Sequence, residues 1–467
     1  MKEVQLAIVG GGPAALSAAV QAAKLGVSSI VLDENPQLGG QIYRQPAFKI
    51  VDEEQRGKHY REGKQILADV ARFSDKIDVS NDSLVWGYFG QKELAVLHNG
   101  RPELLKAQQL LIATGAYDRP IPFPGWTLPG VFTAGGVQIM IKSQRVLPGG
   151  RFLLAGSGPL QLAVADQLLE AGAKVVAVVE ATSTMRMMRS LPSLLRQPGL
   201  VFEGFNYITK FSLHRVPYIR SHVIVRALGS ERVEQAVIAA VDENWEPLAG
   251  TERTFDADAI CLGYGLIPNI DLTRLCGCAH EYNHTLGGWK PTHNEHMEST
   301  VPGVFVAGDG CGIGGVYVAI QQGKLAAIYG ANNLGLLDDS AADKLAKPIR
   351  SKLSALQKFE MALGELYSLE NGIYTLATDD TVICRCEEVK LRDIREAIHS
   401  GASHVDDIKR RTRSGMGYCQ GRMCGSSLQG IVESELNLRP EDAGHLKSRL
   451  PIKPVPITAL LDLWESV

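Results

Sequence analysis

Four cysteines in the last quarter of the chain have the residue type and the spacing for thiolate ligation of a metal. One residue lies between Cys384 and Cys386, 32 residues separate Cys386 from Cys419, and four separate Cys419 from Cys424. Four thiolates brought together from two loops suit either zinc or a small iron–sulfur cluster, because both accept four cysteine ligands. Zinc ribbons usually carry pairs with two residues between the cysteines, and neither pair here has that spacing. In a reducing compartment such a pattern favours metal ligation over disulfides.

The segment between the two pairs is expected to form two short helices. The stretch "LRDIREAIHSGASHVDDIKRRT" (391–412) predicts one helix on each side of Ser400-Gly401. Because four cysteines already complete a ligand set, we expect His399 and His404 to be surface residues. Four basic side chains crowd the second pair: Arg410, Arg411, Arg413 and Arg422. They either offset the negative charge of a thiolate-bound cluster or form a solvated basic face.

The N-terminal stretch "VQLAIVGGGPAALSAAVQAAKLGVSSIVLDE" (4–34) predicts a dinucleotide-binding unit. It is an apolar strand, a glycine turn, an alanine-rich helix and a second strand that ends in acid. Gly10 and Gly12 would form the tight turn and admit a pyrophosphate to the helix N-terminus. Asp33 would accept both hydroxyl hydrogens of a ribose, and Ala15 replaces the third glycine. The predicted nucleotide contacts here are Gly10, Gly12, Pro13, Ala14, Asp33 and Glu34.

Three further stretches accompany this turn. "LDENPQLGGQIYR" (32–44) contains a double glycine, "LLIATGAYDRPIPFPG" (110–125) is a strand that runs into a Thr-Gly turn, and "STVPGVFVAGDGCGIGG" (299–315) is a strand that runs into a Gly-Asp pair. Over about residues 1–335 the set resembles the two-dinucleotide-binding-domain flavoprotein family. The resemblance implies FAD, with the Thr-Gly turn beside its adenine half and Asp309 on its ribityl chain. The further predicted FAD contacts are Gly40, Gln41, Thr114, Gly115, Gly308 and Asp309.

A second strand-turn-helix-strand unit covers residues 150–180, with Gly156 and Gly158 in its turn and Glu180 at its end. The flavoprotein family places its nicotinamide nucleotide domain here. Gln161 stands where a glycine or alanine should let helix and strand pack closely, so this fingerprint is degenerate. The unit either binds NAD(P) or is retained as a structural domain.

Redox dithiols are not expected. Disulfide reductases of that family carry a cysteine pair after the double glycine or inside the nicotinamide domain, whereas here Gln41-Ile42-Tyr43-Arg44 follows the glycines. The remaining cysteines are expected to be buried structural thiols: Cys261, Cys276, Cys278 and Cys311. Gln41 and Tyr43 would then line the flavin pocket or an interface, with a core position as the alternative for Tyr43.

The cysteine segment carries a second resemblance. "GMGYCQGRMC" (415–424) and its surroundings are similar to the bacterioferritin-associated-ferredoxin-like [2Fe-2S] domain, in the form fused to alpha subunits of heteromeric amine and opine oxidases. This implies one [2Fe-2S] cluster on Cys384, Cys386, Cys419 and Cys424. Over the full length the chain resembles the alpha subunits of opine oxidase, D-hydroxyproline dehydrogenase, L-proline dehydrogenase and hydrogen cyanide synthase complexes. "GGQIYRQ" is closer to the opine and hydroxyproline branch.

The resemblance implies an electron-transfer subunit without catalytic residues of its own. A partner beta subunit with its own FAD would oxidise the substrate C–N bond, with an FMN at the subunit interface and a small third subunit as further expectations. One branch of the family holds ATP in place of FAD, and Asp309 favours FAD because ATP has no ribityl chain. The alternatives are a stand-alone NAD(P)H-dependent flavin reductase, a hydrogen cyanide synthase subunit that serves glycine oxidation, and a non-catalytic iron–sulfur carrier.

Bulk properties set the remaining expectations. The 467 residues are 45% hydrophobic and carry a formal charge of −3, which gives no reason to expect nucleic acid as a partner. No apolar run of 18 residues predicts a membrane span. We expect a cytoplasmic protein, with peripheral membrane attachment through its electron acceptor as the alternative.

The predicted fold class is α/β, with two Rossmann-like domains and a small helical C-terminal [2Fe-2S] domain. The predicted segments are an FAD-binding domain in two parts (1–148 and 269–337), an inserted NAD(P)-binding-like domain (149–268), a helical linker (338–377), the [2Fe-2S] domain (378–437) and an extended Pro-rich tail (438–467).

Overall fold

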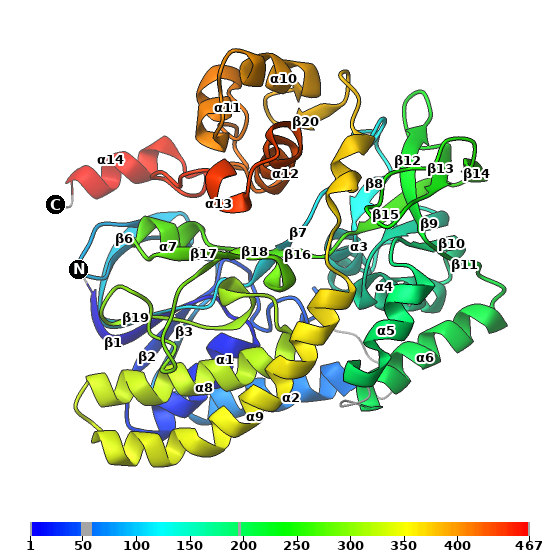
Figure 1. Ribbon diagram of the computed structural model, residues 1–467. Helices are drawn as coiled ribbons and strands as arrows, with labels where there is room; N and C mark the ends of the chain where they lie inside the picture. The colour runs from blue at the N-terminus through cyan, green and yellow to red at the C-terminus, as the bar shows by residue number, and fades with distance from the viewer. Residues whose placement is uncertain (1, 48–57, 195–197, 466–467) are drawn as a thin grey trace. The chain divides into compact units, whose positions relative to one another are not determined.

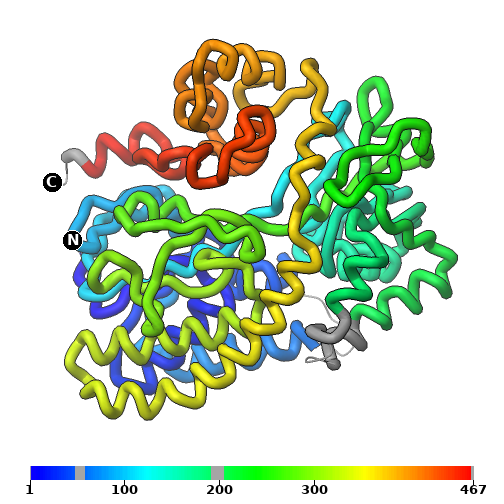
Figure 2. Tube along the Cα trace, in the orientation of Figure 1, coloured from blue at the N-terminus to red at the C-terminus, as the bar shows by residue number. Residues whose placement is uncertain are grey.

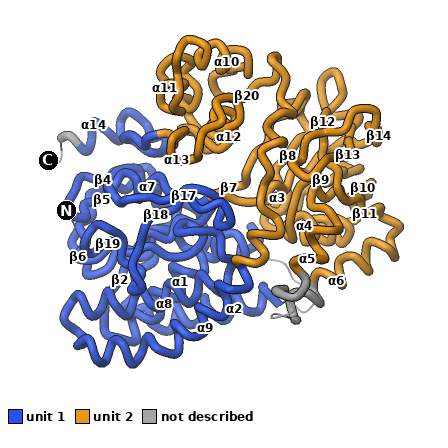
Figure 3. Tube along the Cα trace, viewed as in Figure 1, with its two compact units in different colours: residues 1–116, 268–360, 447–467 blue, residues 117–267, 361–446 orange. Residues whose placement is uncertain are grey.

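A computed structural model describes residues 2–47, 58–194 and 198–465 of the chain. Contacts divide the chain into two compact units (Figure 3). The first unit comprises residues 1–116, 268–360 and 447–467, and the second comprises residues 117–267 and 361–446. These units are coarser than the six predicted segments, whose boundaries stay a prediction.

The first unit is built on a seven-stranded sheet in the order β3-β2-β1-β6-β5-β4, with β19 also pairing with β6 (Figure 1). β3, β2, β1, β6 and β19 run parallel, and β4 and β5 continue antiparallel from β6. Residues 6–9 of β1 and all of β2 are buried, because a parallel sheet covered on both faces needs apolar side chains on both sides. The sheet strands are β1 (Lys2–Val9), β2 (Ser29–Leu32), β3 (Ile77–Ser80), β4 (Ser83–Tyr88), β5 (Glu93–His98), β6 (Arg101–Ile112) and β19 (Val304–Val306).

Helices α1 and α8 lie side by side in this unit (Figure 1). Nine of the twelve residues of α1 are buried, and most of these are alanines. Small side chains let the helix backbones approach closely, and Gly323 of α8 faces the backbone of Ala14. The other elements of the unit are α1 (Pro13–Lys24), α2 (Lys58–Arg72), α7 (Asp271–Leu275), β17 (His280–Asn283), β18 (Gly288–Pro291), α8 (Gly315–Asn333), α14 (Ile457–Glu465) and two short 3₁₀ helices (His284–Leu286 and Gly308–Cys311).

The second unit contains a parallel five-stranded sheet in the order β11-β10-β9-β15-β8 and a three-stranded antiparallel sheet, β12-β13-β14. Its strands are β8 (Val131–Thr133), β9 (Arg151–Gly156), β10 (Lys174–Glu180), β11 (Tyr218–Arg220), β12 (His222–Leu228), β13 (Gln235–Ala240), β14 (Arg253–Asp256) and β15 (Ala259–Gly263). Its first helices are α3 (Ala134–Ile139), a π-helical turn (Met140–Gln144), α4 (Pro159–Glu170), α5 (Thr184–Leu194) and α6 (Pro198–Leu213). The succession β9, α4 and β10, with β9 and β10 paired in parallel, is the predicted strand-turn-helix-strand arrangement.

The same unit ends in a small module around the four metal-ligand candidates. Its apolar core includes Ile383, Leu391, Ile394, Ile408 and Leu428. The module consists of β20 (Val382–Cys384), β21 (Val389–Lys390), α10 (Leu391–His399), α11 (Val405–Thr412), α12 (Gly425–Leu436) and α13 (Pro440–Ala443). Helices α10 and α11 confirm the two helices predicted around Ser400-Gly401.

Three elements span the division between the units: β7 (Ala116–Asp118), β16 (Leu266–Pro268) and α9 (Asp339–Leu366). A 3₁₀ helix (Asn371–Leu376) follows α9, so the stretch predicted as a helical linker is helical over most of its length.

The C-terminal segment, red in Figure 2, belongs to the first unit. Ile452 donates its backbone N–H to the carbonyl of Trp86 at 3.0 Å. The prediction of an extended tail over 438–467 is wrong near both of its ends, because α13 and α14 lie within it. Residues 445–456 have neither helix nor strand, but α14 follows directly after Pro456. The prolines exclude a helix only over the stretch that they occupy, and the apolar, proline-free residues after them form one.

Along the part of the chain that the structure describes, no helix combines the length and the apolar composition needed to cross a bilayer.

The contact between α1 and α8 yields a test of packing. A Cβ atom on Gly323 would lie 2.1 Å from the carbonyl oxygen of Ala14, whereas one on Gly330 of the same helix would lie no closer than 4.0 Å to any neighbour outside its own turn. We expect Gly323→Ala to lower the free energy of unfolding by about 1–3 kcal/mol through overpacking. Gly330→Ala should leave it unchanged or raise it slightly, because alanine favours helix. Equal apparent melting temperatures for the two variants would contradict the packing argument.

Candidate functional site

The first glycine turn leaves bare backbone at the start of α1. Gly10 has a φ of 108°, and a Cβ there would lie 2.3 Å from the carbonyl oxygen of Ala113, so no other residue fits. Gly12 is the N-cap of α1 and provides no side-chain cap, and Pro13 opens the helix. A Cβ on Gly12 would have Gly40 as its nearest neighbour, at 3.8 Å. A phosphate is the group that such a helix N-terminus accepts.

The two acids predicted to bind ribose face different surroundings. Asp33 is buried beside the turn, since a Cβ on Gly11 would lie 2.2 Å from its Oδ2. Its Oδ1 accepts hydrogen bonds from the backbone N and from Nδ2 of Asn35, at 2.7 and 2.8 Å. Burial raises the pKa of the Asp33 carboxyl, an effect that the hydrogen bonds from Asn35 reduce. Glu34 instead pairs with Lys453 of the C-terminal segment. Asp33 is therefore the acid that lies beside the glycine turn.

The Thr-Gly turn after β6 is tied to the returning chain. Thr114 donates its Oγ1 hydrogen to the carbonyl of Asn269 at 3.0 Å, and the Asn269 N–H donates to the carbonyl of Gly115 at 2.9 Å. These bonds hold the turn at the carboxyl end of the sheet, where ligands of such folds bind.

A second carboxylate lies at the start of α8. Asp309 Oδ1 accepts hydrogen bonds from the backbone N–H groups of Gly314 and Gly315, at 3.1 and 3.0 Å. Burial raises the pKa of this carboxyl. A Cβ on Gly308 would lie 3.1 Å from Cβ of Ala14, so the Gly-Asp pair is next to the first turn of α1. The predicted contacts from distant parts of the sequence thus converge.

The double glycine lets its loop reach the turn. A Cβ on Gly40 would lie 2.8 Å from Cα of Gly12. Gln41 beyond it is exposed, while Tyr43 is buried and donates its hydroxyl hydrogen to Glu62 Oε2 at 3.3 Å. The burial of Tyr43 fits the core alternative, and its place in the flavin pocket or at an interface stays a prediction.

These features fit an FAD. A dinucleotide needs bare backbone at a helix N-terminus for its phosphates and a carboxylate at the end of the second strand for its ribose. The turn at Gly10–Gly12 and Asp33 meet both needs, and Asp309 adds a carboxylate at a second helix start. Which of these residues contact the cofactor stays a prediction.

The four metal-ligand candidates lie together as two pairs of thiols. Cys424 donates to the sulfur of Cys384, which lowers the pKa of Cys384 to about 6, and Cys386 is hydrogen-bonded to Cys419. All four interact electrostatically. Within the described ranges, no group of three or more His, Cys, Asp or Glu side chains is arranged around one metal ion. Two pairs of thiols suit a cluster in which each of two irons takes two thiolates.

Glycines bring the two cysteine loops together. A Cβ on Gly417 would lie 2.3 Å from Cβ of Cys386, and the N–H of Gly415 points to the sulfur of Cys384 at 3.5 Å. Backbone N–H groups directed at ligand sulfurs tune cluster potentials. Gly417 is thus explained by the close approach of the two cysteine loops.

The basic side chains divide into two kinds. Arg422 turns inward, donating from Nε to the hydroxyl of Tyr117 at 2.9 Å and from a guanidinium nitrogen to the carbonyl of Cys419 at 3.2 Å. Arg410 and Arg413 are exposed and pair with acids of the module, and Arg411 is also exposed. The solvated-face alternative therefore fits all but Arg422.

The two histidines also differ. His399 is exposed, as predicted. His404 is partly exposed, and its Nδ1 accepts the backbone N–H of Asp406 as the N-cap of α11, so this histidine also has a structural role.

Sequence reasoning missed the contacts that fix this module within the second unit. Ser427 donates to the carbonyl of Pro120 at 3.0 Å, and Trp126 donates its indole N–H to the carbonyl of Val382 at 2.6 Å. Each bond joins residues more than 250 positions apart. No local pattern marks such residues.

The other cysteines confirm the expectation of buried thiols: Cys261, Cys276, Cys278 and Cys311. Burial raises the pKa of each, to about 12 for Cys311, and these thiols therefore stay protonated and unreactive near neutral pH.

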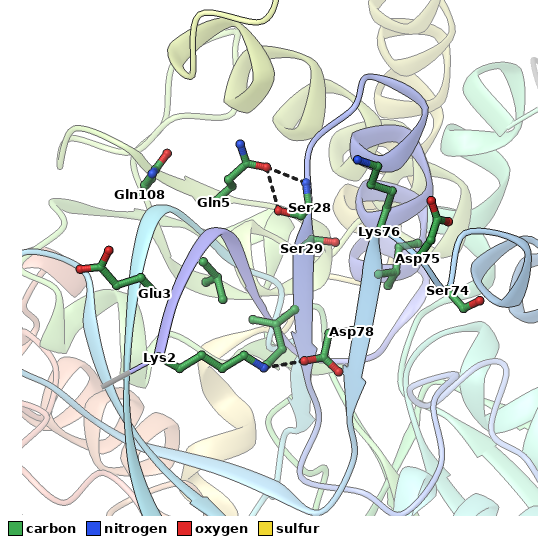
Figure 4. A pocket seen from close by; sticks show the side chains of 13 residues that line it. Lys2, Glu3, Gln5, Ser28, Ser29, Ser74, Asp75, Lys76, Asp78 and Gln108 are labelled. Atoms are coloured by element: carbon green, nitrogen blue, oxygen red, sulfur yellow. Dashed lines mark hydrogen bonds and ion pairs between the residues drawn. The ribbon is translucent and has the colours of Figure 1, made fainter.

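A shallow hollow lies at the amino ends of β1, β2 and β3 (Figure 4). Lys2 pairs with Asp78 across it at 2.6 Å, and Gln5 accepts from Ser28 at 2.8 Å. Ligands of parallel α/β sheets bind at the opposite, carboxyl edge. We assign no function to this hollow.

Comparison with known proteins gives two family matches. Residues 4–198 and 220–323 match the family described as pyridine nucleotide-disulphide oxidoreductase, and residues 382–434 match the BFD-like [2Fe-2S] binding domain. The two families confirm the predicted fold class and the predicted cofactors, FAD and a [2Fe-2S] cluster.

Individual relatives extend over the whole chain. It is 35% identical over 459 residues to hydrogen cyanide synthase subunit HcnB of Pseudomonas aeruginosa, with 98% of each chain covered. It is 35% identical over 470 residues to an opine oxidase subunit from Rhizobium meliloti, covering 98% of this chain and 87% of that one. The solved structure of L-proline dehydrogenase from P. horikoshii shares the fold, with a TM-score of 0.70, 20% identity, and coverage of 98% of this chain and 79% of that chain.

Gly12 gives a test of the flavin site. A Cβ added at Gly12 would lie 3.8 Å from its nearest neighbour, Cα of Gly40, so the protein has room for it. The valine side chain would project into the predicted path of the pyrophosphate. We expect Gly12→Val to be purified folded but flavin-poor, as measured by the visible flavin absorbance and by circular dichroism. Gly204→Val, at a glycine with no neighbour within 4 Å, is the matched control and should keep its flavin. A full FAD complement in Gly12→Val would refute the assignment.

Cys419 gives a test of the cluster. Cys419→Ser should remove the visible charge-transfer absorption and the paramagnetic signal of the reduced cluster, because it takes away one of four thiolates, while FAD stays bound. Cys278→Ser, at a buried thiol outside the module, should keep both signals. About one zinc and no iron or acid-labile sulfide in anaerobically prepared protein would contradict the cluster.

Proposed function

The chain belongs to the pyridine nucleotide-disulphide oxidoreductase family, and on that premise we propose that it transfers electrons within a heteromeric dehydrogenase of amino acids or opines. The chain is a flavin- and [2Fe-2S]-dependent oxidoreductase subunit related to subunits of opine oxidase and of hydrogen cyanide synthase. The proposed substrate is an opine, proline or hydroxyproline, or a related amino acid, and its C–N bond is oxidised on a partner beta subunit that contains its own FAD.

One observation carries this proposal: a flavin fold and a [2Fe-2S] module occur on one chain whose relatives along its whole length are named as enzyme subunits. Bound FAD supplies two-electron redox chemistry, and a [2Fe-2S] cluster exchanges electrons singly. A chain that holds both serves to pass electron pairs onward one at a time. The four remaining cysteines are buried, which supports electron transfer without a redox dithiol.

The placement of substrate oxidation on the partner rests on what the chain's own residues do. The polar groups gathered at the first turn serve a dinucleotide: Asp33, Thr114 and Asp309 are all engaged with nearby backbone. We therefore assign them to holding the cofactor. The subunit names of the relatives support a partner, for which an FMN at the interface and a small third subunit stay further proposals.

A second candidate is a hydrogen cyanide synthase subunit that serves glycine oxidation. The identity to HcnB, which covers 98% of both chains, favours it. The stretch "GGQIYRQ" favours the opine branch, and the substrate separates the two candidates.

The proposal predicts that oxidation requires the partner. We expect the isolated chain to show no amine-dependent dye reduction, because its polar cofactor-side groups bind the cofactor. The complex purified with its co-expressed neighbours should reduce dye with one class among opines, proline isomers and glycine. In that complex Cys419→Ser should slow transfer to one-electron acceptors, while Cys278→Ser should not. Robust turnover of any of these substrates by the isolated chain would overturn the proposal.

A further inference from the structure

The second glycine turn differs from the first in what surrounds its acid. Glu180 ends β10 and Asp33 directly follows β2, and both acids are buried, with 1% and 5% of their surfaces exposed. Its Oε2 accepts hydrogen bonds from Gln161 Nε2 at 2.8 Å and from the backbone N–H of Gly158 at 3.2 Å. Its Oε1 accepts from the N–H of Thr182 at 2.9 Å. The Glu180 carboxylate is therefore held by three hydrogen bonds from the chain itself, one of them from the Gln161 side chain.

Gln161 is the residue that completes this arrangement. It stands at the third position of the fingerprint, where the first turn has Ala15, and it is fully buried. A Cβ on Gly263 of the neighbouring strand would lie 3.2 Å from Cβ of Gln161, so α4 packs closely on β15 at this position. Removing the bond to Glu180 would take this hydrogen bond from the buried amide nitrogen of Gln161, which is costly, while Glu180 would keep those from Gly158 and Thr182.

An aromatic ring occupies the space in front of this turn. A Cβ on Gly158 would lie 3.7 Å from Cγ of Tyr367 and 4.0 Å from Cδ2 of the same ring. The hydroxyl of Ser157 is 3.5 Å from the carbonyl oxygen of Tyr367. At the first turn the corresponding neighbour is Gly40, which has no side chain. The place where a pyrophosphate would rest is thus bare in one fold and covered in the other.

Tyr367 belongs to a segment that we call the strap, residues 365–376, which leads into the cluster module. Arg186 of α5 binds the strap at three points: Glu370 at 2.5 Å, the carbonyl of Glu365 at 2.7 Å, and the hydroxyl of Ser368. All these residues lie in the second unit.

The far end of the strap is fixed as well. Gly372 donates its N–H to the carbonyl of Asn244 at 3.0 Å. Tyr374 packs so closely on α12 that a Cβ on Gly430 would lie 2.1 Å from its ring. The strap therefore connects the second glycine turn with the helix that follows Cys424.

We propose that the second dinucleotide fold is closed to pyridine nucleotides by Gln161, Glu180 and Tyr367, and that its glycine turn instead seats the strap that anchors the [2Fe-2S] module. The family description names pyridine nucleotides, and the residues of this turn do not fit one. NADH and NADPH are accordingly not electron donors to this chain. The proposal does not depend on which substrate the complex oxidises.

The first test is binding of NAD⁺, NADH, NADP⁺ and NADPH to the full FAD-loaded chain by titration calorimetry and by hydrogen exchange. We expect no saturable heat, no added protection of residues 156–161, and no bleaching of flavin by NADH or NADPH. Saturable binding of any of the four with protection of residues 156–161 would overturn the closure. A complex that oxidises no amine and also binds no pyridine nucleotide would contradict the proposed function. It would still support the proposal that the second dinucleotide fold is closed to pyridine nucleotides.

The second test concerns the seat of the strap. Tyr367→Ala should speed hydrogen exchange in residues 365–376 and in α12 at least several-fold, because it removes the ring that rests on the turn. Phe205→Ala, at an aromatic side chain that is 65% exposed in the same unit, is the matched control and should change neither. Tyr367→Phe keeps the ring and should match the wild type, which keeps the test decisive if the alanine variant does not fold. Unchanged exchange in Tyr367→Ala, or equally fast exchange in Tyr367→Phe, would refute the seating of the strap.

Discussion

The structure depends on close backbone packing between neighbouring elements at positions where only glycine fits. A Cβ on Gly10, Gly156 or Gly323 would lie between 2.1 and 2.3 Å from a carbonyl oxygen of a neighbouring strand or helix. The first two contacts bring each glycine turn onto the adjacent strand, and the third brings α8 onto α1. Because α8 lies against α1, the carboxylate of Asp309 comes next to the turn that opens α1. The cofactor site is thus a consequence of helix packing as much as of the glycine fingerprint.

The same turn geometry has opposite consequences in the two folds because the neighbours differ. At the first turn the nearest neighbour is the backbone of Gly40, and the acid Asp33 keeps its place beside bare amides. At the second turn a tyrosine ring and a glutamine amide take the positions that phosphate and ribose would need. A fingerprint therefore predicts the fold of such a unit better than it predicts a ligand, since the ligand depends on residues contributed from elsewhere in the chain.

Local patterns were enough to predict the elements of both turns and the four cysteines. The start of α1 at Pro13 and the two helices around Ser400-Gly401 depend on nearby residues, and periodicity and capping report those directly. The sequence did not predict that Glu34 turns away from the glycine turn, because its partner Lys453 lies more than 400 positions away. Tyr367 was missed for the same reason: nothing in "ELYSLENG" indicates contact with a turn some 200 residues earlier.

The cluster module is tied to the rest of its unit at several points, and this has a consequence for electron transfer. Arg422 links the carbonyl of Cys419 to the hydroxyl of Tyr117, and Tyr117 follows the predicted FAD contact Gly115 by two positions in the chain. Within the second unit, these hydrogen bonds therefore tie the backbone of a cluster ligand to Tyr117. Electron transfer rates depend on the distance between the redox centres, and a module that moves little keeps that distance constant. A strap held by Arg186, together with the bonds to Tyr117, limits the motion of the module, so a second fold without a nucleotide still serves as its rigid support.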